Sequence, residues 1–103
     1  MDMLTNKCEN IIILMREHIY LFESFEDVYV FGSILDPDVF SNDIDLLVIY
    51  QEFTRDINSD VTRIQSELQE MCGKPIDLTA LSVTELKDTA FLKKIEPCYL
   101  KIK

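Results

Sequence analysis

The spacing of apolar residues along the 103-residue chain predicts three helices. In residues 3–25 apolar side chains recur at three- and four-residue steps, and further apolar positions widen this stripe, as in a helix that packs on a sheet. A second amphipathic stripe covers residues 57–72. The third predicted helix begins at Ser82 or Thr84 and continues to about residue 95.

Residues that commonly flank helices mark the ends of the first two predicted helices. Thr5 or Asn6 is a candidate N-cap for the first helix, and Asn58 or Ser59 for the second. Gly73 follows the second stripe directly, where a left-handed backbone conformation suits glycine.

Four short apolar segments predict β-strands at about residues 27–31, 44–50, 75–81 and 99–102. The segment at residues 44–50 is apolar on both faces beyond Asp45, which is typical of a central strand that is covered on both sides. These patterns together predict helices packed against a sheet.

A Gly-Ser pair and two aspartates lie at the junctions of the first two predicted strands. Gly32 and Ser33 end the first strand, and glycine permits a close turn whose backbone can approach a phosphate. Asp43 and Asp45 open the second strand, and side chains two residues apart in a strand point to the same side. Paired carboxylates beside exposed amides favour the binding of Mg²⁺ and a nucleotide.

Asp77 is an acidic residue within the otherwise apolar segment PIDLTAL. A buried and unpaired carboxylate would cost several kcal/mol, so a metal ion shared with the other aspartates would explain this position. The alternative is an aspartate at a strand edge that is exposed to water.

Several other polar residues are weaker candidates. His18 is the single histidine, and it is either a general base or an ordinary partly buried helix residue. Asp36 and Asp38 are either extra metal ligands or solvated turn residues, in a loop whose Val39 and Phe40 are expected to pack on the core. Five lysines near the C-terminus are either phosphate contacts or solvated side chains: Lys87, Lys93, Lys94, Lys101 and Lys103.

Composition excludes several classes of protein. The net charge is −9, which argues against direct nucleic-acid binding, because such a surface needs clustered Lys and Arg. No apolar run is long enough to span a bilayer, and the N-terminal segment is too polar for a signal peptide. The length and the 48% of hydrophobic residues suit a single domain over residues 1–103.

The cysteines Cys8, Cys72 and Cys98 are odd in number, widely spaced and without a CxxC motif. This pattern predicts reduced thiols in a cytoplasmic protein, and it disfavours a zinc site.

The order Gly32-Ser33, loop, Asp43-x-Asp45 and a later Asp77 resembles the DNA polymerase β-like nucleotidyltransferase superfamily, and by size the minimal nucleotidyltransferases, or MNT proteins. The resemblance covers nearly the whole chain. It implies an α/β (α+β) fold in which a mixed β-sheet is flanked by helices and carries the three carboxylates on neighbouring strands.

The resemblance also implies a mechanism. Asp43 and Asp45 would bind the Mg²⁺ that carries ATP, and Asp45 would bridge to a second Mg²⁺ shared with Asp77. Two such ions stabilise the attacking and leaving oxygens of an in-line displacement. Asp77 would also assist deprotonation of the acceptor hydroxyl, while Gly32 and Ser33 would hold the β- and γ-phosphates.

Two features depart from the family pattern. Members often carry Arg or another Gly shortly after the GS pair, where this chain has Ile34 and Leu35. The loop from Ile34 to Asn42 is also slightly shorter than is usual. Both features bear on the grip on the triphosphate rather than on the metal site.

The resemblance implies a protein partner. MNT proteins act as antitoxins of small helical HEPN ribonuclease toxins and, in characterised cases, transfer AMP to a toxin tyrosine. A chain of this length has no room for a nucleic-acid-holding domain, so the acceptor would be a protein, or a small molecule held at a homo-oligomer interface. The alternatives are a module that neutralises its partner by docking alone and, less favoured, an aminoglycoside nucleotidyltransferase.

Overall fold

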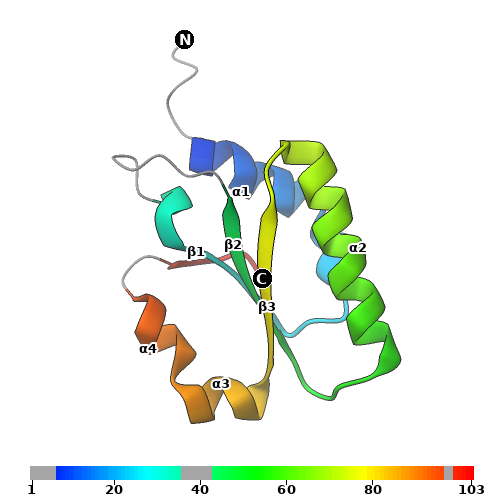
Figure 1. The fold of residues 1–103 in the computed structure, drawn as a ribbon, viewed down its shortest axis with the longest axis vertical. Helices are drawn as coiled ribbons and strands as arrows, with labels where there is room; N and C mark the ends of the chain where they lie inside the picture. The colour runs from blue at the N-terminus through cyan, green and yellow to red at the C-terminus, as the bar shows by residue number, and fades with distance from the viewer. Residues whose placement is uncertain (1–6, 36–42, 97–98) are drawn as a thin grey trace.

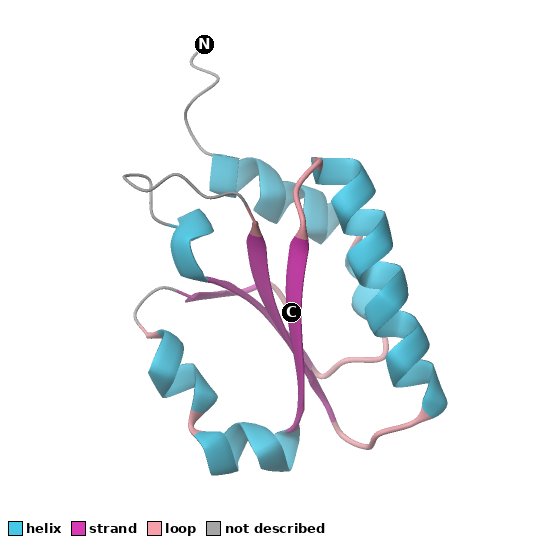
Figure 2. Ribbon diagram, in the orientation of Figure 1, coloured by secondary structure: helices cyan, strands magenta, loops and turns pink. Residues whose placement is uncertain are grey.

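We describe a computed structural model of the chain, which places residues 7–35, 43–96 and 99–103 (Figures 1 and 2). For residues 7–10 and for Ser33 only the backbone is described. The strands are β1 (Asp27–Phe31), β2 (Ile44–Tyr50), β3 (Ile76–Ser82) and β4 (Tyr99–Lys101). The helices are α1 (Lys7–Glu17), α2 (Arg55–Cys72), α3 (Val83–Thr89) and α4 (Phe91–Ile95), with 3₁₀ turns η1 (Ile19–Phe22) and η2 (Gly32–Leu35).

The four strands form one mixed sheet in the order β3-β2-β1-β4. Strand β1 is antiparallel to both β2 and β4, whereas β2 and β3 are parallel and are connected through α2. Figure 1 shows α1 and α2 on one side of the sheet and α3 and α4 on the other. The predicted mixed sheet flanked by helices is therefore confirmed.

Strand β2 distributes its residues between two cores, as the alternation of a strand requires. Its even-numbered side chains, from Ile44 to Tyr50, belong to the main core with α1 and α2. Leu47 and Ile49 instead belong to a second cluster with residues of α3 and α4. We call these two sides of the sheet the α2 face and the α4 face. The prediction that β2 is covered on both sides is confirmed.

The N-terminal helical segment is shorter than predicted. Helix α1 ends at Glu17, and His18, with φ −114° and ψ 33°, separates it from η1. A single helix over residues 3–25 is therefore wrong. After this break Leu21 and Phe22 are almost fully buried in the main core. Ile13, one of the apolar positions between residues 3 and 25, is instead half exposed. Packing of the segment after residue 18 thus outweighs continuation of the helix.

Helix α2 begins earlier than predicted. Thr54 is its N-cap residue, so the expected caps Asn58 and Ser59 lie inside the helix and that prediction is wrong. Ile64 and Leu68 form the buried stripe as expected. Gly73 adopts φ +73°, and its N–H donates to the Gln69 carbonyl oxygen at 2.8 Å, which confirms the predicted C-terminal glycine.

The C-terminal helix is broken in two. Ser82 caps α3 through a capping box with Glu85, which confirms one of the two predicted start residues. Ala90 then adopts a left-handed conformation with φ +52°, so one helix from Ser82 to Ile95 is wrong. The turn at Ala90 redirects the chain and lets Phe91 and Ile95 of α4 pack against the sheet.

The chain end is tied to the start of the sheet. Strand β4 pairs with β1, and Lys101 forms an ion pair with Asp27 at 3.2 Å. The Lys103 ammonium donates to three carbonyl oxygens, those of Phe22 (2.9 Å), Glu23 (3.4 Å) and Phe25 (2.6 Å). These two lysines of the basic tail therefore have structural partners.

Some predictions concern residues outside the description. The caps Thr5 and Asn6, the loop residues Asp36, Asp38, Val39 and Phe40, and the side chains of Cys8 and Cys98 are not described. Cys72 is a free thiol, as predicted. Within the described ranges, no helix has the length and apolar character needed to cross a membrane.

Candidate active site

Three carboxylates, two from neighbouring strands and one from the residue before β2, meet at one end of the sheet. In the parallel pairing of β2 and β3, Asp45 lies directly opposite Asp77, and Asp43 immediately precedes β2. One oxygen from each of the three side chains lies within 4.8 Å of the others. The structure therefore brings together all three aspartates that the sequence singled out.

The environment of Asp77 differs from the expectation. Strand β3 is an edge strand of the described sheet, and the Asp77 side chain is exposed rather than buried. The argument that its burial demanded a metal ion was therefore wrong. The alternative prediction, an aspartate exposed to water at a strand edge, is confirmed. Asp77 nevertheless belongs to the carboxylate cluster, because it lies opposite Asp45 in the strand pairing.

Asp45 is the central member of the cluster, and its environment opposes ionisation. The pKa of Asp45 is raised from 3.8 to about 6, chiefly by partial burial and then by the nearby carboxylates of Asp43 and Asp77. A side-chain hydrogen bond with Asp77 adds to this effect. The cluster thus concentrates negative charge at a point where a cation would stabilise the ionised form.

Gly32 allows the turn after β1 to approach Asp45 closely. Its backbone has φ +84°, a conformation that suits glycine. A Cβ atom at this position would lie 2.5 Å from the Asp45 carboxylate oxygen Oδ2, well inside van der Waals contact. The positive φ therefore favours glycine, and a side chain here would also displace the Asp45 carboxylate. Backbone of the Gly-Ser turn thus lies against the carboxylate cluster.

The turn η2 is anchored to the main core by the residues that depart from the family pattern. Ile34 is 1% exposed and belongs to the main core, and Leu35 packs against that core. The packing of these two side chains holds η2 against the main core. Residues Ile34 and Leu35 therefore serve packing and do not reach toward a phosphate.

The donor set suits Mg²⁺. Carboxylate oxygens are hard ligands, and two oxygens bound to one Mg²⁺ at about 2.1 Å lie about 3–4 Å apart. The ligand atoms of the three aspartates lie within 4.8 Å of one another, a separation that modest side-chain rotation would bring into the range for a shared ion. Asp43, Asp45 and Asp77 are therefore the residues that could hold the metal.

The contacts of His18 lie within the N-terminal helical segment. Its ring nitrogen Nδ1 is 2.9 Å from the Leu14 carbonyl oxygen, and its ring packs against Tyr20. It is partly exposed at the end of α1. These contacts favour a structural role for His18 over that of a general base, although the residue lies in the break between α1 and η1 and not inside a helix.

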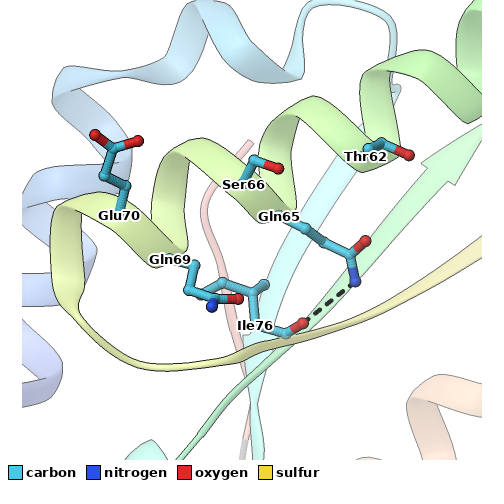
Figure 3. Close-up of a pocket in the computed structure, with 6 residues that line it drawn as sticks. All are labelled: Thr62, Gln65, Ser66, Gln69, Glu70 and Ile76. Carbon is cyan, nitrogen blue, oxygen red and sulfur yellow. Dashed lines mark hydrogen bonds between the residues drawn. The ribbon is translucent and has the colours of Figure 1, made fainter.

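A polar pocket lies on the α2 face, away from the carboxylates. It has a volume of about 490 Å³ and is open to solvent between α2 and the edge strand β3 (Figure 3). Gln65 donates from Nε2 to the Ile76 carbonyl oxygen at 3.2 Å, which satisfies one backbone group at the strand edge. Ile76 belongs to the main core, whereas its neighbour Asp77 points to the opposite face.

An aromatic continuation of the carboxylate row was missed by the sequence-based prediction. The register places four residues side by side across the sheet: Asp77, Asp45, Phe31 and Tyr99. Phe31 and Tyr99 pack with the second cluster, on the α4 face. Because Phe31 directly precedes Gly32, the sequence did indicate that it lies near the carboxylates. No local pattern indicated that the strand of Tyr99 pairs with β1.

Comparison with known proteins identifies the fold. A family model described as "Polymerase beta, Nucleotidyltransferase" matches residues 9–96. Among solved structures, a protein from Sulfolobus solfataricus assigned as a nucleotidyltransferase matches with a TM-score of 0.54 and 19% identity, over 90% of this chain and 79% of the other. No curated protein sequence matches the chain.

A second solved structure has the same fold. It contains the tri-AMPylated HEPN toxin of Shewanella oneidensis in complex with an MNT antitoxin, and the match has a TM-score of 0.55 with 15% identity. It covers 89% of this chain and 71% of the other. The family model spans most of the chain. The chain therefore belongs to the polymerase beta nucleotidyltransferase family.

Proposed function

We propose that this protein transfers a nucleoside monophosphate, AMP from ATP, to a hydroxyl acceptor with the help of Mg²⁺. The observation that carries the proposal is the convergence of Asp43, Asp45 and Asp77 beside the turn at Gly32. Bound Mg²⁺ ions would supply charge stabilisation for the phosphates and for the attacking and leaving oxygens. Membership of a nucleotidyltransferase family supports this reaction type.

Each residue of the site has a distinct task in the proposed reaction. Asp43 and Asp45 hold the metal that accompanies the triphosphate, and Asp45 and Asp77 hold the second metal. The acceptor oxygen attacks the α-phosphorus, a new P–O bond forms, and the bond to the leaving pyrophosphate breaks. Asp77, the exposed carboxylate of the edge strand, accepts the acceptor's proton in this proposal. Backbone amides at Gly32 and Ser33 hold the β- and γ-phosphates.

The proposed acceptor is a tyrosine of a HEPN-type toxin, and this protein would act as its antitoxin. The support is the fold shared with the structure that contains an AMPylated HEPN toxin and an MNT antitoxin. The exposure of Asp77 on an edge strand is compatible with an acceptor carried by a second protein rather than a buried small molecule.

An intact-mass measurement tests this function. A HEPN-type protein from the same organism is incubated with this protein, ATP and Mg²⁺, and we expect it to gain one or more AMP units. Asp45→Asn should slow the gain at least ~100-fold, because losing a metal-mediated contribution costs several kcal/mol and each ~1.4 kcal/mol is tenfold in rate. Asp88→Asn, an exposed α3 residue, serves as the matched charge control.

A second function, neutralisation of the partner by docking alone, is supported by the composition of η2. This turn carries no basic residue, and Ile34 is used for core packing. The phosphates would then have fewer contacts than in an efficient enzyme. If Asp45→Asn protects cells from the toxin as well as the wild type does, docking and not transfer is the biological activity.

A further inference from the structure

We infer that the aromatic residues beside the carboxylates, Phe31 and Tyr99, form a platform on which the base of the nucleoside triphosphate stacks. This inference rests on the proposed function, because it extends the nucleotide site from the phosphates to the base. It also gives a nucleotide preference: a purine, with its larger ring system, gains more from such a platform than a pyrimidine.

The strand register provides the first argument. Asp45 pairs with Phe31 on the neighbouring strand, and Phe31 pairs with Tyr99 on the strand beyond. The row therefore runs without interruption from carboxylates to aromatic rings. Alternation along β2 puts Asp45 on the same face as Leu47 and Ile49, which belong to the cluster that contains Phe31 and Tyr99. All members of the row thus share the α4 face.

The spacing of the row matches a nucleotide. Neighbouring strands are about 4.8 Å apart, so Phe31 and Tyr99 lie about 5 and 10 Å from Asp45 along the row. In a nucleotide, a sugar and a few single bonds of about 1.5 Å each separate the base from the α-phosphorus. Phosphates held at the aspartates would therefore place the base over the aromatic part of the row.

The rings are held in position but remain accessible. Phe91 of α4 packs against Phe31 with an interplanar angle of 84°, and Tyr29 packs against Tyr99 at 85°. Such edge-to-face neighbours fix the orientation of a ring without covering both of its faces. Phe31 and Tyr99 both retain partial exposure, in contrast to the buried Tyr29. Stacking on preorganised rings avoids part of the ordering cost of binding.

The platform would read the face of the base more than its edge. On the described part of the α4 face, the side chains next to the row are mainly apolar, including Leu47. Stacking on aromatic side chains tolerates different bases because every base has a π-face. We therefore expect preference by ring size, purine over pyrimidine.

The test compares ligands with and without a base. Dissociation constants of ATP, CTP and inorganic tripolyphosphate are measured by calorimetry with Mg²⁺, for the wild type and for Tyr99→Leu. We expect the substitution to weaken ATP about fivefold or more, CTP less, and tripolyphosphate not measurably. Leu100→Ala, on the same strand with its side chain on the opposite face, is the matched control and should leave all three constants unchanged.

The outcomes separate this inference from the proposed function. If Tyr99→Leu changes ATP and tripolyphosphate binding equally, or changes neither, the aromatic platform is refuted while the phosphate site stands. If the wild type binds none of the three ligands, the proposed function fails and the platform with it. Unchanged binding of tripolyphosphate by Tyr99→Leu also serves as the internal proof that the variant is folded.

Discussion

The two faces of the sheet differ in what their side chains do. On the α2 face, residues from α1, α2 and the strands form a continuous main core that contains most of the buried apolar residues. On the α4 face, three buried residues, Tyr29, Leu47 and Ile49, are covered by partly buried side chains of two short helices. Asp45 lies on the same α4 face, near the start of β2, where the carboxylates cluster.

This difference shows how a small chain separates stability from chemistry. Even-numbered positions of β2, such as Leu46, supply the main core, and the odd-numbered position Asp45 supplies the carboxylate cluster. Because neighbouring residues of a strand face opposite sides, an unfavourable cluster of like charges can adjoin a well-packed core without entering it. The α4 face is then left partly open, as a binding face requires.

The largest expected effect comes from identical substitutions on the two faces. Leu46 and Leu47 are adjacent and both fully buried, but Leu46 faces the main core and Leu47 the second cluster. We expect Leu46→Ala to lower the free energy of unfolding by about 4 kcal/mol and Leu47→Ala by about 2–3 kcal/mol, because the smaller cluster can collapse around the cavity. Urea unfolding measures both values, and equal losses would contradict the distinction between the faces.

The second-largest expected effect concerns Gly32, in the turn after β1. Gly32→Ala places a side chain at φ +84° and against Asp45, so we expect a loss of about 2 kcal/mol in stability together with loss of the thermal shift caused by ATP and Mg²⁺. Gly73→Ala is the matched control, because Gly73 also has positive φ but no atom lies within 4 Å of the added Cβ. It should lose stability through backbone strain alone and keep the ligand shift. A retained shift in Gly32→Ala would show that the approach to Asp45 is not needed.

A smaller effect concerns pH and the charge of the cluster. The pKa of Asp45 is raised to about 6 in the folded protein, so between the unfolded value near 3.8 and about 6 the folded state binds a proton more tightly than the unfolded state. The resulting contribution to the free energy of unfolding is fully present below pH 3.8. It is lost as the pH rises through about 6. Without metal, Asp45→Asn should therefore be more stable than the wild type by about 1 kcal/mol near neutral pH, a value reduced by solvent screening.

Unfolding curves in EDTA at several pH values measure this difference. The advantage of Asp45→Asn should shrink toward zero as the pH falls to the ordinary range of a carboxyl group, where both forms are neutral. Asp88→Asn, which removes an exposed acid outside the cluster, should not reproduce the pattern. A wild type that is more stable than Asp45→Asn at neutral pH would contradict the electrostatic account.

The smallest expected effect concerns the two lysines at the end of the chain. Lys103→Met removes three hydrogen bonds to the carbonyl oxygens around η1, and we expect a loss of about 0.5–1 kcal/mol with no change in nucleotide binding. Lys101→Met breaks the exposed ion pair with Asp27 and should have the smaller effect on stability. A larger loss of stability for Lys101→Met than for Lys103→Met would show that the ion pair contributes more than the Lys103 hydrogen bonds.

Local patterns predicted the strands well because their information is short-range. Strands β1 and β2 match their predicted ranges, since alternation and apolar runs within a few residues specify them. The helix ends were predicted less well. The breaks at His18 and Ala90 arise where packing of Phe22 and Phe91 outweighs continuation of a helix, and that packing involves residues far away in the sequence.

Local sequence patterns were enough to predict the elements of the site: a Gly-Ser turn after one strand, two aspartates opening the next and a third within another. How these elements meet depends on contacts between distant segments. The parallel register of β2 with β3 sets Asp45 opposite Asp77, and the pairing of β4 with β1 brings Tyr99 into the same row. The exposure of Asp77 likewise depends on β3 lying at the sheet edge. Strand order and register are contacts between distant segments, and periodicity within one segment carries no information about them.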